Sequence, residues 1–260
     1  MKIKEVTDYL DGQFRPELQE AYDNSGLLVG DTEAEVKGVL VALDVVPEVV
    51  KEAVETGSNL IVSHHPLIFG GVKRITPESE LGRMLYAIIK NDIVVYAAHT
   101  NLDNLPNGVN GALAKRLGLT NQKVLRPMTA EAGEGAGLIG ELEEALPLKL
   151  FLEKVKEALV IKVLRCSSLC REEVKRVAIC GGSGAFLIRD AIKAGVDAYI
   201  TADIKYHDFQ SAENRLVLVD VGHYESEQFV QELICDTILK KFSTFACRIT
   251  KTNTNYINYI

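Results

Sequence analysis

Short runs of apolar and β-branched residues alternate with longer amphipathic stretches along this chain. The short runs predict buried strands, and amphipathic stretches of this length predict helices that cover them. One stretch, 47–56, begins with a proline and precedes Gly57, which is typical of the two ends of a helix. The pattern predicts an α/β fold on a mostly parallel sheet. We expect strands at 39–45, 60–63, 93–98, 160–165, 174–180, 198–201 and 216–221.

Three other segments have less regular patterns. Residues 1–22 predict an opening helix, and residues 148–159 predict an amphipathic helix. The glycine-rich residues 133–137 predict a flexible loop that leads into a short strand. The middle of the chain carries no chemical motif.

An internal repeat relates the two halves of the chain. Residues 51–57 align with 189–195 without a gap, and the same offset places 61–63 on 199–201. Residues 94–99 then correspond to 217–223 with one inserted residue. We therefore predict two similar α/β lobes of the three-layer sandwich type that arose by internal duplication. The expected lobes are 1–125 and 126–260, with a C-terminal segment that could pack back on the first lobe.

Composition narrows the class of protein. The 260 residues include 29 lysines and arginines against 36 aspartates and glutamates, a formal net charge of −7. This charge argues against a non-specific nucleic-acid binder, which needs a basic face. No apolar run approaches the roughly 18 residues of a membrane span, and the first residues lack a hydrophobic signal core, so we expect a cytoplasmic protein. The five cysteines form no CxxC pair, so we expect reduced, packed thiols.

Candidate chemistry concentrates on the histidines. There are five, at positions 64, 65, 99, 207 and 223, and four of them lie at or just after the end of an expected strand. Ligands bind at the carboxyl ends of strands in open α/β sheets. His64 and His65 also precede Pro66, which tends to end a strand.

Neighbouring side chains on a strand point to opposite faces, so His64 and His65 can share one ion only if the backbone turns between them. The alternative is a pair of metals. Two further segments place an acid four residues after a histidine, at His99 with Asp103 and at His223 with Glu227. Residues at this spacing share one face of a helix.

The best-placed groups are three imidazoles and two carboxylates, more than one catalytic zinc normally uses. A single histidine is more often a hydrogen-bonded residue than a metal ligand. The prediction of a metal site therefore rests on several histidines that occur together at strand ends and at equivalent positions of the repeat. We predict a dinuclear site between the lobes for two divalent ions, with Zn, Fe, Mn, Co and Ni all compatible. The predicted ligands are His64, His65, Asp103, His223 and Glu227.

Several neighbouring roles stay open. His99 could orient another group or contact a substrate. His207 could line the pocket, or Asp203 could cap a helix and leave His207 exposed. The loop at 180–184 could hold an anion at a helix start, although its glycines are equally expected at a sharp turn. Arg74 and Lys205 receive no role.

Five motifs make the chain similar to a known family: YDNSGLLVG (22–30), SHHPLIF (63–69), AHTNLD (98–103), GGSG (181–184) and GHYESE (222–227). They resemble the NIF-three-like family, also called the GTP cyclohydrolase I type 2 homologues, along nearly the whole chain. The resemblance implies a two-lobed α/β protein, a dinuclear site with the five ligands named above, and a ring-shaped homohexamer. Tyr22 stands where the family often has tryptophan, and Ala202 where it has glycine. The 130–170 stretch has no room for the large middle domain of some relatives.

The predicted site indicates a metal-dependent hydrolase that uses activated water, and the resemblance implies a nucleotide or a related small molecule as the substrate. His99 and Glu227 are the candidate proton carriers. The family name suggests opening of the guanine ring of GTP, and phosphoester or other amidine hydrolysis would suit the same site. The alternative from another class is a non-catalytic, metal-binding interaction or scaffold protein.

Overall fold

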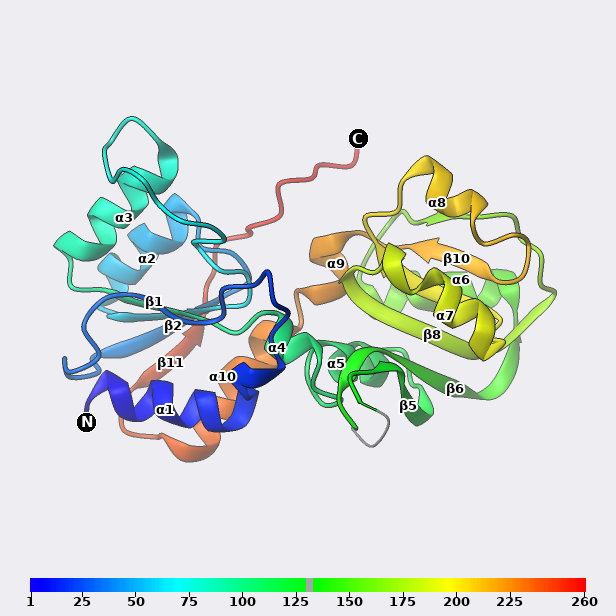
Figure 1. Ribbon diagram of the computed structural model, residues 1–260, viewed down its shortest axis with the longest axis horizontal. Helices are drawn as coiled ribbons and strands as arrows, with labels where there is room; N and C mark the ends of the chain where they lie inside the picture. The colour runs from blue at the N-terminus through cyan, green and yellow to red at the C-terminus, as the bar shows by residue number, and fades with distance from the viewer. Residues whose placement is uncertain (130–132) are drawn as a thin grey trace. The chain divides into compact units, whose positions relative to one another are not determined.

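The computed structural model describes residues 1–129 and 133–260 and divides into two compact units (Figure 1). Unit 1 comprises Met1–Leu102 and Val230–Asn258, and unit 2 comprises Asp103–Phe229 and Tyr259–Ile260. Each unit is a mixed α/β structure with its own sheet. Within the described residues, no helix combines the length and the apolar character needed to cross a membrane.

Unit 1 contains a five-stranded sheet in the order β1-β4-β3-β2-β11. Four neighbouring strands are parallel, and only β1 at the edge runs antiparallel. β2, β3 and β4 are buried along their whole length, which explains their continuous apolar runs. The strands are β1 (Gly26–Val29), β2 (Gly38–Ala42), β3 (Leu60–Ser63), β4 (Val94–Ala97) and β11 (Ala246–Ile249).

Helices cover both faces of this sheet, so unit 1 has three layers (Figure 1). α2 and α3 pack their apolar faces on one side, where Val49, Ala53 and Ile88 join a buried cluster with strand residues such as Ile61. α1 and α10 lie on the other side (Figure 1). As predicted, α2 begins at a proline and ends at Gly57 in the left-handed conformation. The helices are α1 (Ile3–Phe14), α2 (Pro47–Thr56), α3 (Glu80–Lys90), α4 (Thr100–Asp103) and α10 (Val230–Lys241), with a 3₁₀ turn at Pro16–Leu18.

Unit 2 contains a six-stranded sheet in the order β5-β6-β8-β9-β10-β7. Only β8, β9 and β10 are parallel, and the pairs β5–β6, β6–β8 and β10–β7 are antiparallel. The expected mostly parallel sheet is therefore correct for unit 1 and wrong for unit 2. The strands are β5 (Thr120–Pro127), β6 (Gly135–Pro147), β7 (Arg165–Cys166), β8 (Glu173–Ser183), β9 (Ala198–Ala202) and β10 (Val217–Asp220).

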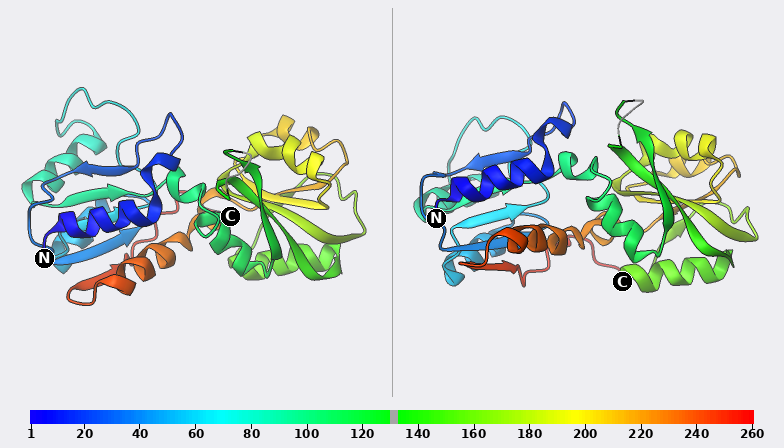
Figure 2. Two further views of the ribbon diagram at one scale, coloured as in Figure 1. Left: turned by 60° about the horizontal axis from the view of Figure 1, so that its bottom comes forward. Right: turned by 90° about the horizontal axis from the view of Figure 1, so that it is seen from below.

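Unit 2 also has helices on both faces of its sheet (Figure 2). α5 and α6 pack on one face around Phe151 and Val155, and α7 packs on the other around Ile188 and Ala191. The predicted amphipathic helix at 148–159 is confirmed as α6. The helices are α5 (Val109–Arg116), α6 (Leu148–Leu159), α7 (Ile188–Ala194), α8 (Tyr206–Gln210) and α9 (His223–Glu227), with a 3₁₀ turn at Ala185–Leu187.

The central strands of the two units pair in the same way. In unit 1, Val39 lies opposite Leu60, and Leu60 lies opposite Val94. In unit 2, Val177 lies opposite Ala198, and Ala198 lies opposite Val217. These are the positions that the repeat alignment matches, so each unit contains three parallel strands in chain order with one shared register.

The strand expected at 160–165 is wrong. Val160 ends α6 in the left-handed conformation with φ of 58°, and its side chain is exposed. Only Arg165–Cys166 pairs as a strand, β7. The apolar residues between them belong to a loop whose Ile161 and Leu164 pack against the core of unit 2. Apolar loop residues that pack against the core therefore gave the same sequence pattern as a buried strand.

Three strands were not predicted at all. β1 is short, the side chains of β5 are exposed or half-buried, and β11 is a largely exposed edge strand. The short strand expected after 133–137 is instead the long β6, which pairs with β5 as a hairpin. Exposed and edge strands carry little hydrophobic alternation, which hides them from sequence patterns.

Candidate metal centre

The first part of the site lies at the carboxyl end of β3 in unit 1. β3 ends at Ser63, and the backbone bends at His64 and His65. The Ser63 hydroxyl donates a hydrogen bond of 2.8 Å to the His65 carbonyl oxygen, which stabilises the bend. This turn is one of the two alternatives that the sequence left open, and it brings the two rings to the same side, with centroids 4.9 Å apart.

His99, which follows β4, joins these two rings. Its centroid lies 5.3 Å from that of His64 and 5.5 Å from that of His65. One ring nitrogen of each residue lies within 4.8 Å of the others, close enough for a shared metal ion. The three residues form what we call the histidine cluster. β3 and β4 are parallel neighbours, so their carboxyl ends place these side chains at one edge of the sheet.

Each ring in the histidine cluster makes a hydrogen bond of 2.7 Å through Nδ1. The acceptors are the Ala98 carbonyl oxygen for His64, Asp44 Oδ1 for His65 and Asp23 Oδ1 for His99. A backbone carbonyl can only accept, so Nδ1 of His64 carries the proton and Nε2 of the neutral ring carries the lone pair. Carboxylates impose the same tautomer, which is the arrangement that second-layer acceptors give to metal-binding histidines.

Asp23 belongs to the YDNSGLLVG segment, which sequence reasoning had noted without a role. It also accepts hydrogen bonds from the Thr100 amide and from the Thr100 and Ser25 hydroxyls. Burial opposes ionisation of Asp23, but the hydrogen bonds from His99 and Thr100 outweigh it and hold the pKa of Asp23 well below its usual range. Asn24 donates to the Ile68 carbonyl oxygen and so holds the loop that follows His65. The segment therefore orients His99 and supports the cluster.

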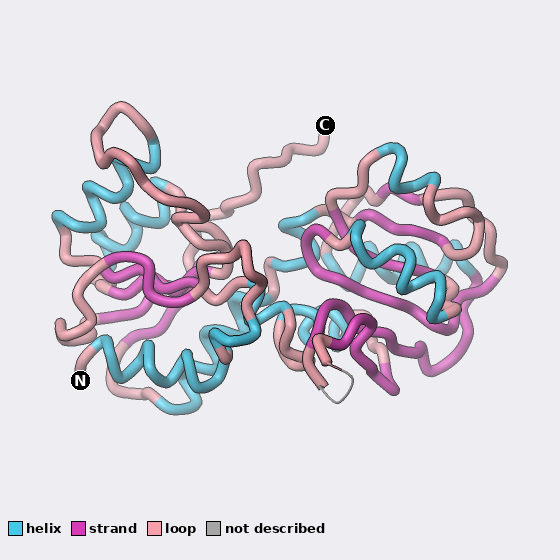
Figure 3. Tube along the Cα trace, in the orientation of Figure 1, coloured by secondary structure: helices cyan, strands magenta, loops and turns pink. Residues whose placement is uncertain are grey.

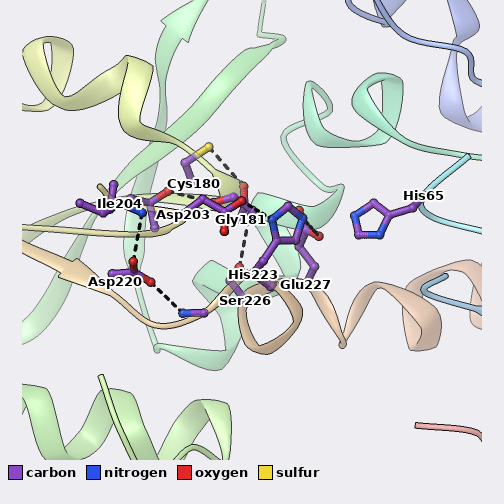
Figure 4. A network of polar contacts seen from close by, with 12 residues as sticks. His65, Cys180, Gly181, Asp203, Ile204, Asp220, His223, Ser226 and Glu227 are labelled. Carbon is purple, nitrogen blue, oxygen red and sulfur yellow. Dashed lines mark hydrogen bonds and ion pairs between the residues drawn. The ribbon is translucent and has the colours of Figure 1, made fainter. Parts of the chain in front are cut away.

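The second part of the site lies in unit 2, on the short helix α9 (Figure 4). His223 begins α9 and Glu227 ends it, and His223 Nε2 lies 3.0 Å from Glu227 Oε2. His223 Nδ1 lies 2.7 Å from Asp203 Oδ2, so an acceptor again fixes the ring. Glu227 is buried, whereas Asp203 is half-exposed. We call Asp203, His223 and Glu227 the His223 cluster.

A buried carboxylate, Asp220, holds the loops that carry this cluster (Figure 4). It accepts hydrogen bonds from the amides of Ile204 at 3.0 Å and Gly222 at 3.1 Å, and it forms an ion pair with Arg165. Asp203 directly precedes Ile204 and has a φ of 56°, a conformation that costs energy outside glycine. Asp220 thus connects the end of β10 to the turn that aims Asp203 at His223.

The glycine loop at 180–184 has a packing role. The Gly181 amide donates to Asn110 Oδ1 at 3.0 Å, and the Gly182 amide donates to Ser226 Oγ at 2.9 Å. Gly182 has a φ of 62°, and a Cβ there would overlap Glu227 Oε1. Two of the amides that an anion could have used are therefore already bonded within the protein. The glycines allow the strand to pass close to Glu227.

Asp103, the remaining predicted ligand, is the last residue of α4, which begins directly after His99. Its backbone carbonyl oxygen accepts a hydrogen bond of 3.1 Å from Asn110 Nδ2. Because the same Asn110 side chain accepts from the Gly181 amide, it connects Asp103 to the glycine loop. The backbone of Asp103 is thus connected to the glycine loop through Asn110, and the Glu227 carboxylate packs directly against Gly182.

The open roles of Asp203 and His207 can now be described. Asp203 does not cap α8, because Asp208 accepts the hydrogen bond from the Lys205 amide at the start of that helix. Asp203 orients His223 instead. His207 is exposed on α8 and stacks edge to face with Tyr206. Sequence reasoning missed Asp23 and Asp44 as partners of histidines, although Asp44 lies at the end of the strand expected at 39–45, which was a usable signal.

The side chains present suit a divalent transition metal. Imidazole nitrogens and carboxylate oxygens are ligands for Zn, Fe, Mn, Co and Ni. Ca²⁺ prefers oxygen ligands alone, so a set with three histidines does not favour it. The fixed tautomers direct ligand lone pairs, and Asp103 and Glu227 could supply negative charge. The chemistry of the donor set therefore fits a metal, while the number and identity of ions are separate questions.

Comparisons with known proteins identify the family and the fold of this chain. A model of the family described as Duf34/NIF3 (NGG1p interacting factor 3) matches residues 1–256. The chain is 37% identical over 230 residues to the GTP cyclohydrolase 1 type 2 homolog of Clostridium perfringens, covering 87% of each chain. It is 36% identical over 235 residues to the protein of that name from Streptomyces coelicolor, covering 87% of this chain and 81% of the relative.

A solved structure has the same fold. The crystal structure of a Bacillus cereus protein related to NIF3 matches with a TM-score of 0.91 and 26% sequence identity. The match covers 100% of this chain and 99% of the other.

Proposed function

Because the chain belongs to the Duf34/NIF3 family, we propose that it is a dinuclear metal-binding protein that acts as a metal-dependent hydrolase. The ligands to the ions would be His64, His65, Asp103, His223 and Glu227. The observation that carries this proposal is the pair of acceptors that hold Nδ1 of His64 and His65, because they leave Nε2 of each ring as the ligand atom.

When bound, two divalent ions would supply Lewis-acid activation of water and of the bond to be broken. The protein would add proton transfer and orientation. His99 suits a proton carrier, because its ring lies beside those of His64 and His65 and Asp23 holds its Nδ1 in one orientation. Glu227 is the second candidate, since it lies 3.0 Å from His223 Nε2 and could accept a proton or bind an ion.

The substrate proposal rests on the names of relatives. Two of them are GTP cyclohydrolase 1 type 2 homologs, so a nucleotide or a related small molecule is the class to test first, beginning with GTP. Fold and metal site do not by themselves define a reaction, so phosphoesters and other amidines belong in the same screen. We further propose that the protein is a cytoplasmic homohexamer. We also propose that the two lobes arose by duplication, which the shared register of their central strands supports.

The test is metal analysis followed by turnover. The purified protein is stripped of metal, reloaded with Mn, Fe, Co, Ni or Zn, measured for ions per chain, and screened with GTP and related substrates. Two ions per chain and metal-dependent turnover are expected, and both should fall in Asp103→Ala while its circular dichroism stays native. Two ions without turnover of any substrate would favour the non-catalytic scaffold, and no stoichiometric metal would refute the site.

A further inference from the structure

The C-terminal segment, residues 250–260, has no helix or strand (Figure 3), and hydrogen bonds hold its first part on unit 1. Its first residues bind Glu52 of α2, which accepts hydrogen bonds from the Thr250 and Thr252 hydroxyls and from the Lys251 amide. Burial opposes ionisation of Glu52, but these hydrogen bonds outweigh it and lower the pKa of Glu52. The segment follows β11, which is parallel to β2, so it leaves the sheet at the edge that carries the histidine cluster.

One side chain of this segment is buried. Thr254 is 5% exposed, and its neighbours Asn253 and Asn255 are more exposed. The Thr254 hydroxyl donates a hydrogen bond of 2.8 Å to Asp44 Oδ2. The other oxygen, Asp44 Oδ1, accepts the 2.7 Å hydrogen bond from His65 Nδ1. A threonine at the end of the chain therefore contacts the carboxylate that holds a predicted metal ligand.

We propose that Thr254 is a positioning residue for the metal centre, which holds His65 in place through Asp44. With a hydrogen bond at each oxygen, the carboxylate of Asp44 has one preferred rotation, and Oδ1 stays aligned with Nδ1 of His65. That alignment keeps the proton on Nδ1 and directs Nε2 to the other rings of the histidine cluster. The inference rests on the proposed function only in its claim about metal affinity.

A second carboxylate in unit 1 is held in a similar way. Asp23, which holds His99, has its other oxygen bound by the Thr100 amide and hydroxyl and by the Ser25 hydroxyl. Those donors lie beside Asp23 or His99 in sequence, whereas Thr254 lies 210 positions from Asp44. The C-terminal segment thus supplies to Asp44 the support that local residues supply to Asp23.

The experiment compares Thr254→Val with Thr254→Ser and with Thr252→Val, which alters the same segment at its contact with Glu52. The first readout is the tautomer of His65 in metal-free protein, from long-range ¹⁵N–¹H correlations of labelled histidine. The second is the affinity of the reloaded protein for Zn²⁺ and the absorption spectrum with Co²⁺. Loss of one hydrogen bond in Thr254→Val should weaken Zn²⁺ binding roughly threefold to tenfold.

Thr254→Val should also mix the tautomers of His65 and shift the Co²⁺ spectrum, while Thr254→Ser and Thr252→Val keep the wild-type tautomer and affinity. Wild-type values for Thr254→Val, or an equal defect in Thr254→Ser, would overturn the proposal. If the wild-type protein binds no stoichiometric metal, the proposed function fails. The tautomer measurement still decides the role of Thr254 in that case.

Discussion

The histidine cluster of unit 1 and the His223 cluster of unit 2 differ in chemistry although both lie at the ends of equivalent strands. Unit 1 brings together three imidazole rings, whereas unit 2 combines one ring with Glu227 and also contains Asp103. Imidazole nitrogens and carboxylate oxygens are both ligands for divalent transition metals, so the two units present different types of candidate ligand. At the ends of equivalent strands, unit 1 thus presents mainly ring nitrogens and unit 2 mainly carboxylate oxygens.

The supports of the two clusters differ as well. In the repeat alignment, His65 of unit 1 corresponds to Asp203 of unit 2. His65 is a predicted metal ligand, whereas Asp203 is the hydrogen-bond partner of the predicted ligand His223. Asp23 is fully buried behind His99, whereas the Asp203 side chain is 50% exposed. The histidine–carboxylate pair of unit 1 should therefore contribute more to stability than that of unit 2. Four predictions test this contrast.

The largest effect is expected from Gly182→Ala in unit 2. The left-handed φ and the overlap with Glu227 Oε1 should together cost about 2 to 5 kcal/mol and displace Glu227. Urea unfolding and metal content measure the two effects. Gly195→Ala is the matched control, because Gly195 has a similar φ of 66° but no close neighbour, so it should cost about 1 to 2 kcal/mol and keep the metal. Equal effects would contradict the packing role of Gly182.

Removal of metal should come next. Ions that bind only the folded protein stabilise it by about 3 kcal/mol when the free ion is at about 100 times its Kd. Chelation should therefore lower the Tm, and the same treatment of a His64→Ala, Glu227→Ala double variant should leave the Tm unchanged. A chelation effect that persists in the double variant would place the metal elsewhere.

The two histidine–carboxylate pairs can be compared directly. Asp23→Asn should lower the free energy of unfolding by about 1.5 to 3 kcal/mol, because a buried charge with several hydrogen bonds is lost. Asp203→Asn should lower it by less than about 1 kcal/mol, because that pair is half-exposed and screened by water. Both are measured by urea unfolding of the metal-free protein. Similar values for the two variants would remove the distinction between the supports.

The smallest expected effect is the dependence of the free energy of unfolding on pH in the acid range. The pKa of Asp23 is lower in the folded than in the unfolded protein. Its contribution to the free energy of unfolding is therefore complete above the unfolded pKa of about 4, and it is lost as the pH falls toward the folded pKa. The stability difference between wild type and Asp23→Asn should be constant above about pH 5 and shrink toward pH 3. A difference that grows in acid would contradict the assigned direction.

The central strands of both units were predictable because a buried strand has a run of apolar residues that can be seen in the local sequence. β2, β3, β4, β8, β9 and β10 have near-continuous apolar runs, and the repeat alignment matches positions that pair in one shared register. The ends of these strands directed attention to His64, His65 and His223. Their roles as metal ligands stay predictions, as does the role of Asp103.

Other parts left little trace in the sequence. The exposed strand β5 and the edge strand β11 lack alternation, and the apolar loop after α6 resembled a strand. The contribution of Asp23 to His99 depends on a segment 76 residues away, which no local period records.

The sequence by itself determined the α/β class, the repeated strand–helix units and the histidines at strand ends, because periodic burial and chain order are local properties. Only the tertiary structure decided which acceptor holds each Nδ1, why Gly182 must lack a side chain, and that Thr254 supports Asp44. These depend on contacts between segments far apart in sequence. Their geometry is set by how the sheets and loops pack, and side-chain hydrogen bonds form only where that packing brings the partners within about 3 Å.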